Sequence, residues 1–332
     1  MYFHQKPFIV AELGASHLGS FNRMLETITA AAKAGADAVK FQTYTPDEIS
    51  VDVPIESGPW ADRSYHDLYL EAMVPWEWHN ALFNFARKLG LVPFSTPFSE
   101  AAVARLETIH CPMYKIASPE IVHHRLIAAA ARTGKPLIIS AGMATIAEIK
   151  VAQEIAAVNG SSDATFLHCI SAYPAEVSDF NLNSLNWYKF AGIDFGLSDH
   201  SLGSTAAVTA VALGASVIEK HFCLSRADGG PDAAFSLMPH EFHDMVKQCR
   251  DAYSALGESV FGVKDCEQTS LQYRPSIWLV KPIKAGEALT SGHLAIRRPN
   301  YGLPPGDLEV IIGKKVNQTL KPNTPLTWDL IV

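Results

Sequence analysis

Residues 194–222 read DFGLSDHSLGSTAAVTAVALGASVIEKHF, and this stretch predicts one repeating unit of the fold. Its ends, 194–200 and 216–222, are short apolar runs typical of β-strands, and 204–213 between them has the pattern of a helix. A helical crossover of this kind joins parallel strands. The two strands close on His200 and His221, so we expect both imidazoles at one rim of one sheet, where they can share a divalent metal.

The same alternation recurs along most of the chain. Eight runs predict strands, at 8–13, 38–44, 91–97, 113–118, 136–142, 164–171, 194–200 and 216–222, and helical patterns lie between most of them. Eight strands alternating with helices over about 255 residues predict an α/β fold of the (β/α)8 TIM-barrel type. A doubly wound open sheet is the main alternative, but its characteristic Gly-x-Gly-x-x-Gly turn is missing.

A second domain is expected after the barrel, because the alternation stops near residue 257 and a new pattern begins after Arg274-Pro275-Ser276. We expect a barrel over 1–257, a linker over 258–273 and a small domain over 274–332 that is near the lower size limit for an independent core. The connection 45–75 is longer than an ordinary strand–helix loop. Its segment 58–63, GPWADR, predicts a structured flap over the site.

Composition excludes several functions. The 332 residues carry 27 basic and 34 acidic side chains, a formal net charge of −7, which argues against a nucleic-acid partner. No apolar run reaches the roughly 20 residues of a membrane span, and residues 1–6 lead straight into the first strand rather than forming a signal sequence. The cysteines are odd in number and lack a Cys-x-x-Cys pair, which predicts reduced, mostly packing thiols in a cytoplasmic protein: Cys111, Cys169, Cys223, Cys249 and Cys266.

The residues that end the predicted strands are the candidate site, because active sites of such barrels lie at the carboxyl ends of the strands. They are polar or reactive at almost every strand: Glu12, Lys40, Gln42, Thr96, Lys115, Ser118, Glu120, Ser140, Ser171, Tyr173, Ser198, His200, Lys220 and His221. Lysines and hydroxyls around one mouth favour a compact anion such as a phosphorylated metabolite. The alternative is that Lys40 and Lys115 are solvated lysines at the rim.

Other residues leave two roles open. Asp199 stands one position before His200, and Glu219 stands two positions before His221. Each of them either orients a reactive group or forms an internal salt bridge. Asp232 lies in the Gly/Pro-rich stretch 226–237, which predicts a loop over the mouth carrying a site carboxylate, or a plain turn with a solvated one. His168 stands alone in an apolar run and is predicted to be a core histidine.

At these residues the sequence resembles the sialic acid synthase family, the phosphoenolpyruvate-dependent nonulosonic acid synthases. The matching motifs are AELG at 11–14, GADAVKFQ at 35–42, YKIAS at 114–118, GLSDH at 196–200 and IEKHF at 218–222. The resemblance covers essentially the whole chain, because residues 274–332 are similar to the antifreeze-like (SAF) domain that follows the barrel in that family. The motifs occur in the family's order and at its spacing.

The resemblance implies a transferase that condenses phosphoenolpyruvate with the aldehyde of an acetamido-deoxy sugar and releases phosphate. It places a divalent metal, Mn²⁺ or else Mg²⁺ or Co²⁺, on His200 and His221. The family's phosphoenolpyruvate contacts match Lys40, Thr96, Lys115, Ser118, Ser140 and Ser198, and its sugar-side positions match Gln42, Glu120, Tyr173 and Asp232. Either Glu12 or Glu120 is the proton acceptor. In a domain-swapped homodimer, Arg298 would reach the sugar bound to the partner's barrel.

The loop 228–237, DGGPDAAFSL, resembles the branch of the family that makes pseudaminic acid. Ser171 agrees, because neuraminate synthases often have Asn there. The apolar Ala233, Ala234 and Phe235 suit a 6-deoxy sugar. The N-acetylneuraminate and N,N'-diacetyllegionaminate branches are the alternatives within the family. Outside it, the sequence allows a Schiff-base aldolase with Lys115 or Lys220 as nucleophile, or an inactive barrel whose end domain binds sugars.

Overall fold

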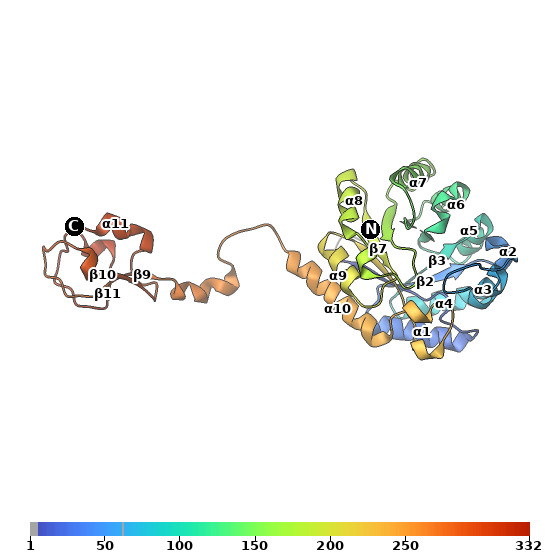
Figure 1. Ribbon diagram of the computed structural model, residues 1–332, viewed down its shortest axis with the longest axis horizontal. Helices are drawn as coiled ribbons and strands as arrows, with labels where there is room; N and C mark the ends of the chain where they lie inside the picture. Colours follow the sequence, from blue (N-terminus) through green and yellow to red (C-terminus); the bar gives the residue numbers. More distant parts are fainter. Residues whose placement is uncertain (1–5, 62) are drawn as a thin grey trace. The chain divides into compact units, whose positions relative to one another are not determined.

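The computed structural model describes residues 6–61 and 63–332, so Asp62 of the predicted flap segment and residues 1–5 lie outside the described residues. The chain divides into two compact units, Met1–Gly257 and Glu258–Val332. Each unit has its own hydrophobic core. We describe each by itself (Figure 1).

The first unit is a closed barrel of eight parallel strands, as the sequence predicts, and the open-sheet alternative is wrong. The strands are β1 (Phe8–Glu12), β2 (Ala38–Thr43), β3 (Val92–Pro97), β4 (Tyr114–Ile116), β5 (Leu137–Ser140), β6 (Thr165–Cys169), β7 (Phe195–Asp199) and β8 (Val217–His221). The ring closes because β1 pairs with β8 as well as with β2, in a register that sets Glu12 beside both Lys40 and His221. The site is therefore built where the first and last strands meet.

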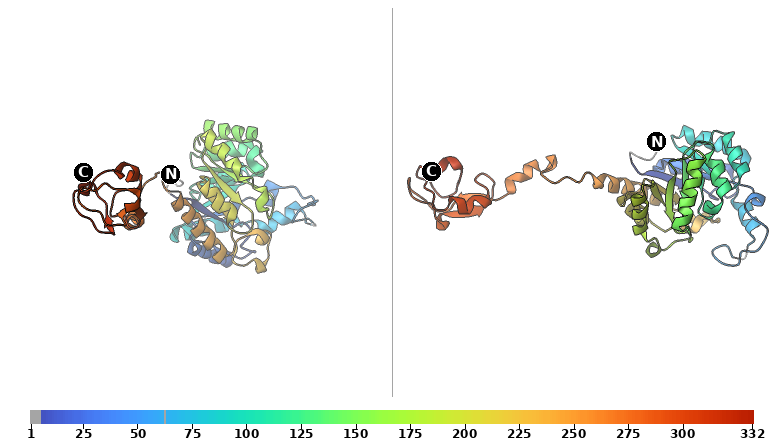
Figure 2. Two further views of the ribbon diagram at one scale, coloured as in Figure 1. Left: turned by 60° about the vertical axis from the view of Figure 1, so that its left-hand side comes forward. Right: turned by 90° about the horizontal axis from the view of Figure 1, so that it is seen from above.

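Helices surround the strands (Figures 1 and 2). The main ones are α1 (Phe21–Ala34), α4 (Trp76–Lys88), α5 (Glu100–Glu107), α6 (His124–Ala131), α7 (Ile146–Val158), α8 (Leu185–Ala191), α9 (Thr205–Ala212) and α10 (Pro239–Leu256). Helix α1 shows why they form. Ser20 caps its first turn by accepting from the Arg23 N–H, Gly35 ends it with φ at 94°, and Met24, Ile28 and Ala31 form its buried stripe.

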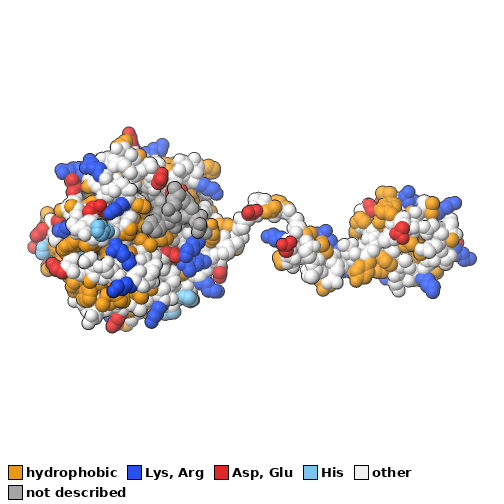
Figure 3. Space-filling model, turned by 180° about the vertical axis from the view of Figure 1, so that it is seen from behind, with side chains coloured by type: hydrophobic (Ala, Val, Ile, Leu, Met, Phe, Trp, Pro, Cys, Tyr) orange, Lys and Arg blue, Asp and Glu red, His pale blue; other side chains and the backbone are white. Residues whose placement is uncertain are grey.

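Short elements fill the connections. The long segment after β2 contains α2 (Pro46–Ile49) and α3 (Tyr65–Ala72), so it is structured as predicted. The barrel unit also has single 3₁₀ turns: η1 (Pro119–Val122), η2 (Val177–Asp179), η3 (Leu182–Ser184), η4 (Arg226–Asp228) and η5 (Ala233–Phe235). Within the described residues, no helix has the length and apolar character needed to cross a membrane. On the face in Figure 3, acidic and basic side chains are interspersed.

The second unit begins with η6 (Asp265–Tyr273) and contains a small antiparallel sheet in the order β10–β9–β11. Its elements are β9 (Ser276–Leu279), β10 (Leu294–Arg297), β11 (Thr324–Pro325), α11 (Leu308–Ile311), η7 (Ser291–His293), η8 (Pro305–Asp307) and η9 (Trp328–Leu330). Ile277, Leu279, Ile311 and Leu326 are fully buried at its centre. A core this small suffices for a compact unit but leaves little reserve stability.

Candidate functional site

Glu12, at the end of β1, organises one side of the barrel mouth. Its Oε1 accepts hydrogen bonds from Lys40 Nζ at 3.2 Å and Gln42 Nε2 at 2.7 Å, while its Oε2 accepts from the Gly14 N–H at 2.6 Å. Lys40 also donates to Thr96 Oγ1 at 3.1 Å. Side chains two apart on a strand face the same way, so Lys40 and Gln42 reach the same carboxylate. Four of the predicted site residues thus form one connected group.

Glu219 completes this group from the opposite direction. Its Oε1 lies 3.3 Å from Lys115 Nζ, 3.7 Å from Lys40 Nζ and 3.2 Å from Ser198 Oγ. Of the two roles that the sequence left open for Glu219, the internal salt bridge is the one observed. Lys40 and Lys115 are 4% and 2% exposed, so the alternative of solvated rim lysines is wrong.

Burial and the neighbouring charges shift the pKa values of these groups in opposite directions. Burial alone would lower the pKa of Lys40, but Glu12 and Glu219 outweigh it and raise that pKa. For Lys115 burial prevails over Glu219, and its pKa is lowered. Burial tends to raise the pKa of Glu219, yet Lys115 and Lys40 hold it below its usual value. The barrel interior therefore holds two lysines and two acidic side chains in one paired cluster.

Small hydroxyl side chains surround a glycine just beyond the ends of β4, β5 and β6. Ser118 Oγ accepts from the Gly142 N–H at 3.0 Å, and a Cβ on Gly142 would come within 2.3 Å of Ser171 Oγ. A side chain at position 142 would therefore displace the two serine hydroxyls. Ser140 Oγ is buried and has no hydrogen-bond partner within the described part of the chain. A buried hydroxyl without a partner is costly, so it is available to a ligand oxygen.

His200 and His221 lie together, as the sequence predicts, with ring centroids 5.5 Å apart. His200 Nδ1 is 2.8 Å from the Ile170 carbonyl, which leaves Nε2 as its free nitrogen. Burial, followed by the charge of His200, holds the pKa of His221 well below its usual value. The His221 imidazole is therefore neutral and has a nitrogen lone pair that can bind a metal. Asp232 Oδ2 is 3.7 Å from His221 Nδ1.

These donors fit a divalent metal held by two imidazoles, whose remaining positions go to water and substrate. Across residues 6–61 and 63–332, no group of three His, Cys, Asp or Glu side chains is assembled closely enough to hold an ion by itself. The histidine pair accordingly would supply two ligands rather than a complete protein cage.

Two carboxyl groups at the mouth have raised pKa values. Burial raises the pKa of Asp232 to about 6, with the nearby charge of Glu12 adding to it. Asp232 Oδ2 accepts from the Ala15 N–H at 3.3 Å, so it faces the site rather than solvent. Burial also raises the pKa of Glu120 to about 7, and its Oε2 has no partner among the described residues. Both groups can exchange protons near neutral pH.

An aromatic group covers the histidine pair. The ring centroids of Tyr173 and His200 are 4.3 Å apart, and those of Phe235 and His221 are 4.9 Å apart. Trp60, from the predicted flap segment, lies 5.5 Å from Tyr173 and donates its indole N–H to the Pro231 carbonyl at 3.1 Å. The flap therefore contacts the loop after β8, over the mouth.

Two predicted site residues lie elsewhere. Lys220 points away from the mouth: fully buried, it pairs with Asp199 at 2.8 Å on the outer side of β7 and β8, where Cys249 and Glu241 of α10 are its further electrostatic neighbours. Its proposed role as a Schiff-base nucleophile at the mouth is therefore wrong. Arg298 lies in the second unit with an exposed side chain.

Sequence reasoning treated Cys169 as a packing residue, yet it lies in the site, with Sγ 3.8 Å from His200 Nδ1. The signal that could have found it is its position two residues before Ser171, because side chains two apart in the predicted strand 164–171 face the same way. All five cysteines are free, and only Cys266 is exposed. His168 was predicted to be a core histidine, but it is only half-buried; its Nε2 lies 2.6 Å from the Phe180 carbonyl, so it does have a partner.

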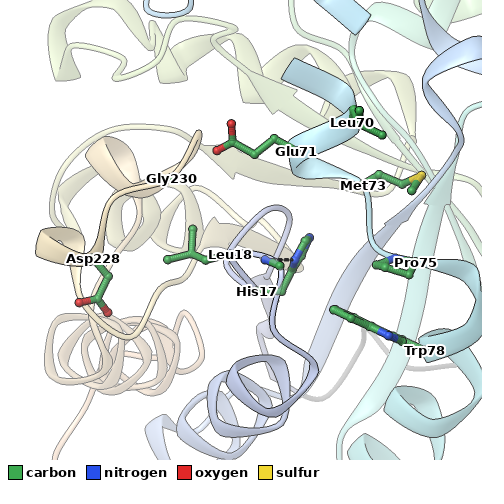
Figure 4. A pocket seen from close by; sticks show the side chains of 10 residues that line it. His17, Leu18, Leu70, Glu71, Met73, Pro75, Trp78, Asp228 and Gly230 are labelled. Carbon is green, nitrogen blue, oxygen red and sulfur yellow. Dashed lines mark hydrogen bonds between the residues drawn. The ribbon is translucent and has the colours of Figure 1, made fainter. Parts of the chain in front are cut away.

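A cavity of about 560 Å³ lies beside the mouth and is distinct from this cluster (Figure 4). His17, Leu18 and Gly230 line it, together with Trp78 and Asp228. His17 already uses both ring nitrogens, with Nδ1 accepting from the Gly19 N–H at 2.9 Å and Nε2 3.2 Å from the Ala72 carbonyl. None of the predicted site residues lines this cavity.

Comparison with known proteins agrees with this architecture. Residues 27–261 match the NeuB family and residues 274–332 match the SAF domain. The chain is 43% identical over 333 residues to a pseudaminic acid synthase of Helicobacter pylori, covering 98% of each, and 33% identical to an N,N'-diacetyllegionaminic acid synthase of Campylobacter jejuni, covering 96% of this chain and 98% of that one.

Among solved structures, an N-acetylneuraminic acid synthetase of Leptospira borgpetersenii is similar with a TM-score of 0.73 and 32% identity, over 81% of this chain and 92% of that one. The closed barrel, its buried polar mouth and the SAF domain together define an enzyme of the sialic acid synthase type. The chain belongs to the NeuB family, which confirms the resemblance seen in its sequence.

Proposed function

We propose that the chain is a pseudaminic acid synthase. It would condense phosphoenolpyruvate with 2,4-diacetamido-2,4,6-trideoxy-L-altrose to give pseudaminic acid and phosphate. The observation that carries this proposal is the graded similarity to relatives of near-equal length. Identity is 39–43% to three pseudaminic acid synthases, 33% to legionaminic acid synthases and 31% to an N-acetylneuraminate-9-phosphate synthase.

Phosphoenolpyruvate would bind at the polar mouth. Lys40 and Lys115 supply positive charge for its phosphate and carboxylate, and the hydroxyls of Thr96, Ser118, Ser140 and Ser198 donate hydrogen bonds to its oxygens. The unpartnered Ser140 hydroxyl supports this assignment, because a ligand oxygen would satisfy it. Gln42, Ser171, Tyr173 and Asp232 would contact the sugar.

The reaction needs charge stabilisation and proton transfer. As C3 of phosphoenolpyruvate bonds to the aldehyde carbon, positive charge develops at C2, and the Glu12 and Glu219 carboxylates can stabilise it. The aldehyde oxygen gains a proton, and water adds to C2 and loses its first proton. The bond from C2 to the phosphate oxygen then breaks as the C2 hydroxyl becomes the keto group and its remaining proton passes to the leaving phosphate. Glu12 or Glu120 would accept the proton from water. Glu120 is suited to this, because its pKa of about 7 is near the working pH.

A divalent metal, Mn²⁺ by preference, would be held by His200 and His221. When bound it acts as a Lewis acid toward the aldehyde oxygen. The chain's own contribution is to keep the His221 imidazole neutral through burial and to orient His200 through the Ile170 carbonyl. Asp232, 3.7 Å from His221, would orient that ring.

We further propose a cytoplasmic homodimer in which the SAF domain, 274–332, follows the linker 258–273 and crosses to the partner's barrel. Arg298 would there contact an acyl group of the sugar. The exposed side chain of Arg298 and the free cysteines of the chain are compatible with this arrangement.

The deciding experiment is a phosphate-release assay with phosphoenolpyruvate and Mn²⁺. It offers three sugars in parallel: the altrose derivative, 2,4-diacetamido-2,4,6-trideoxymannose and N-acetylmannosamine. Release with the altrose derivative alone supports the proposal. Preference for a mannose sugar would move the chain to the legionaminate or neuraminate branch. Retained activity after chelation, with borohydride trapping of Lys115, would instead support a Schiff-base aldolase.

A further inference from the structure

Trp60 joins the site from a segment far away in the sequence. It comes from the connection between β2 and α4, yet its indole N–H donates to the carbonyl of Pro231 in the loop after β8, at 3.1 Å. Its ring lies 5.5 Å from that of Tyr173, which follows β6, and 6.5 Å from that of Phe235. Three loops thus bring three aromatic rings to one place.

Two of these rings lie directly on the histidine pair. The ring of Tyr173 packs on His200 and the ring of Phe235 packs on His221. The centroids of these two aromatic rings are 5.0 Å apart, and Trp60 forms the next layer outward. Phe235 is 2% exposed and Trp60 is half-buried. The indole N–H of Trp60 is already used by Pro231, so the ring presents an apolar surface to whatever lies beside it.

The place of these rings relative to the histidines indicates which part of a sugar they would contact. If the aldehyde end lies at the histidines, the other end of the open chain extends outward past Tyr173 toward the layer that holds Trp60. A methyl group at C6 suits an aromatic surface, whereas a hydroxymethyl group there would lose water without gaining a partner from the indole.

Resting on the proposed function, we propose that Trp60, with Tyr173 and Phe235, forms an apolar wall that receives the C6 methyl group of a 6-deoxy sugar. Trp60 is then a specificity-determining residue, which selects the 6-deoxy substrate over its 6-hydroxy counterpart. Discrimination by one group in an apolar pocket is about 10- to 200-fold.

The test compares two substrates that differ only at C6: 2,4-diacetamido-2,4,6-trideoxy-L-altrose and 2,4-diacetamido-2,4-dideoxy-L-altrose. Trp60→Ala should lower kcat/KM for the 6-deoxy sugar at least about tenfold and leave the 6-hydroxy sugar nearly unchanged, so that the preference disappears. KM for phosphoenolpyruvate should stay the same. Trp60→Phe, which keeps an aromatic ring but lacks the N–H, should keep most of the preference.

Tyr65→Ala is the matched control, because Tyr65 is an exposed aromatic residue of the same connection that packs on Tyr69 rather than on the wall. It should leave the preference unchanged. Equal losses with both sugars in Trp60→Ala would overturn the proposal, since a residue that only holds the loops together would affect both. An equally large loss in Trp60→Phe would also overturn it, because the hydrogen bond to Pro231 would then be what matters.

A binding measurement separates this inference from the proposed reaction. In saturation-transfer NMR with the full chain and the 6-deoxy sugar, the C6 methyl signal should be the strongest of the methyl signals and should fall in Trp60→Ala. That result without turnover by the wild type would retain the wall and reject the proposed function. A C6 methyl signal no stronger than those of the acetamido methyl groups would reject the wall, whatever the turnover.

Discussion

Nζ of Lys115 lies 3.3 Å from Oε1 of Glu219, across the barrel from β4 to β8. The two strands are opposite each other in the closed ring of eight, so this ion pair spans the interior. The same Glu219 oxygen is also near Lys40 and Ser198. One buried carboxylate therefore holds together groups from several strands, and its removal should have consequences for stability as well as for binding.

Glu219→Gln should lower the free energy of unfolding by about 3 kcal/mol at pH 7, because it leaves two buried lysines with Glu12 as their main counter-charge. Urea denaturation measures this. Since the pKa of folded Glu219 is depressed, its contribution is present above the unfolded value of about 4.3 and is lost as the pH falls through the folded value, so the difference should shrink in acid.

The control is Glu71→Gln, whose partner Arg63 is 2.6 Å away in a partly exposed pair. Its cost should stay below about 1 kcal/mol. If the two variants lose similar, small amounts of stability, the Glu219 cluster contributes little to folding.

Glu120→Gln should stabilise the protein at high pH. The raised pKa of about 7 means that the folded state keeps a proton between about pH 4.5 and 7 that the unfolded state has lost, so wild-type stability falls as the pH rises through this window. Gln resembles the protonated acid. The free energy of unfolding of the variant should match that of the wild type near pH 4 and exceed it by about 2 kcal/mol at pH 8. This difference is smaller than the full pKa shift implies, because Glu120 is partly exposed. Parallel stability curves from pH 4 to 8 would show that burial does not perturb Glu120.

Lys220→Met should cost about 3 kcal/mol, because Asp199 would remain buried without its counter-charge. Adding Asp199→Asn should recover much of that loss, since Ser201 would still hydrogen-bond the side chain at position 199. Chemical denaturation of both single variants and the double variant gives the coupling energy. A strictly additive double variant would mean that the pair is not coupled.

His221→Ala should weaken Mn²⁺ binding more than about tenfold, because it removes one of the two proposed imidazole ligands. It should change the melting temperature only modestly, because loss of a neutral imidazole leaves no buried charge unpaired. Electron paramagnetic resonance of free Mn²⁺ measures binding without turnover. His240→Ala, at an exposed position, is the control. Undiminished Mn²⁺ binding by His221→Ala would remove this residue from the metal site, and wild-type turnover without any divalent ion would remove the metal from the reaction.

The strand-end residues show which parts of the fold and the site the sequence predicts. All eight strands were predictable, because a buried parallel strand has a short apolar run and the intervening helices have their own period. The closeness of His200 and His221 followed from adjacency of β7 and β8. Lys220 was misplaced although the alternation of side chains would have put it on the face opposite His221.

Contacts between distant segments were not predictable. Trp60 hydrogen-bonds Pro231, which is 171 positions away in the sequence, and Glu219 hydrogen-bonds Lys115, which is 104 positions away. Both depend on how the ring closes and how loops fold over it, and no local pattern encodes either. The flap was foreseen from its length, but the ring that it brings to the site was not. The paired state of the lysines was missed for the same reason.

Arg298→Ala should raise KM for the sugar about tenfold or more and leave KM for phosphoenolpyruvate nearly unchanged, because a charge-assisted hydrogen bond to an acyl oxygen contributes about 1.5–3 kcal/mol. Arg297→Ala is the matched control, since Arg297 is the exposed neighbour that ends β10. Steady-state kinetics with each substrate varied in turn gives both constants. A role confined to the SAF domain itself would leave both constants unchanged, and equal increases for the two substrates would place Arg298 away from the sugar. Only a selective effect on the sugar fits an arginine that crosses to a partner's barrel.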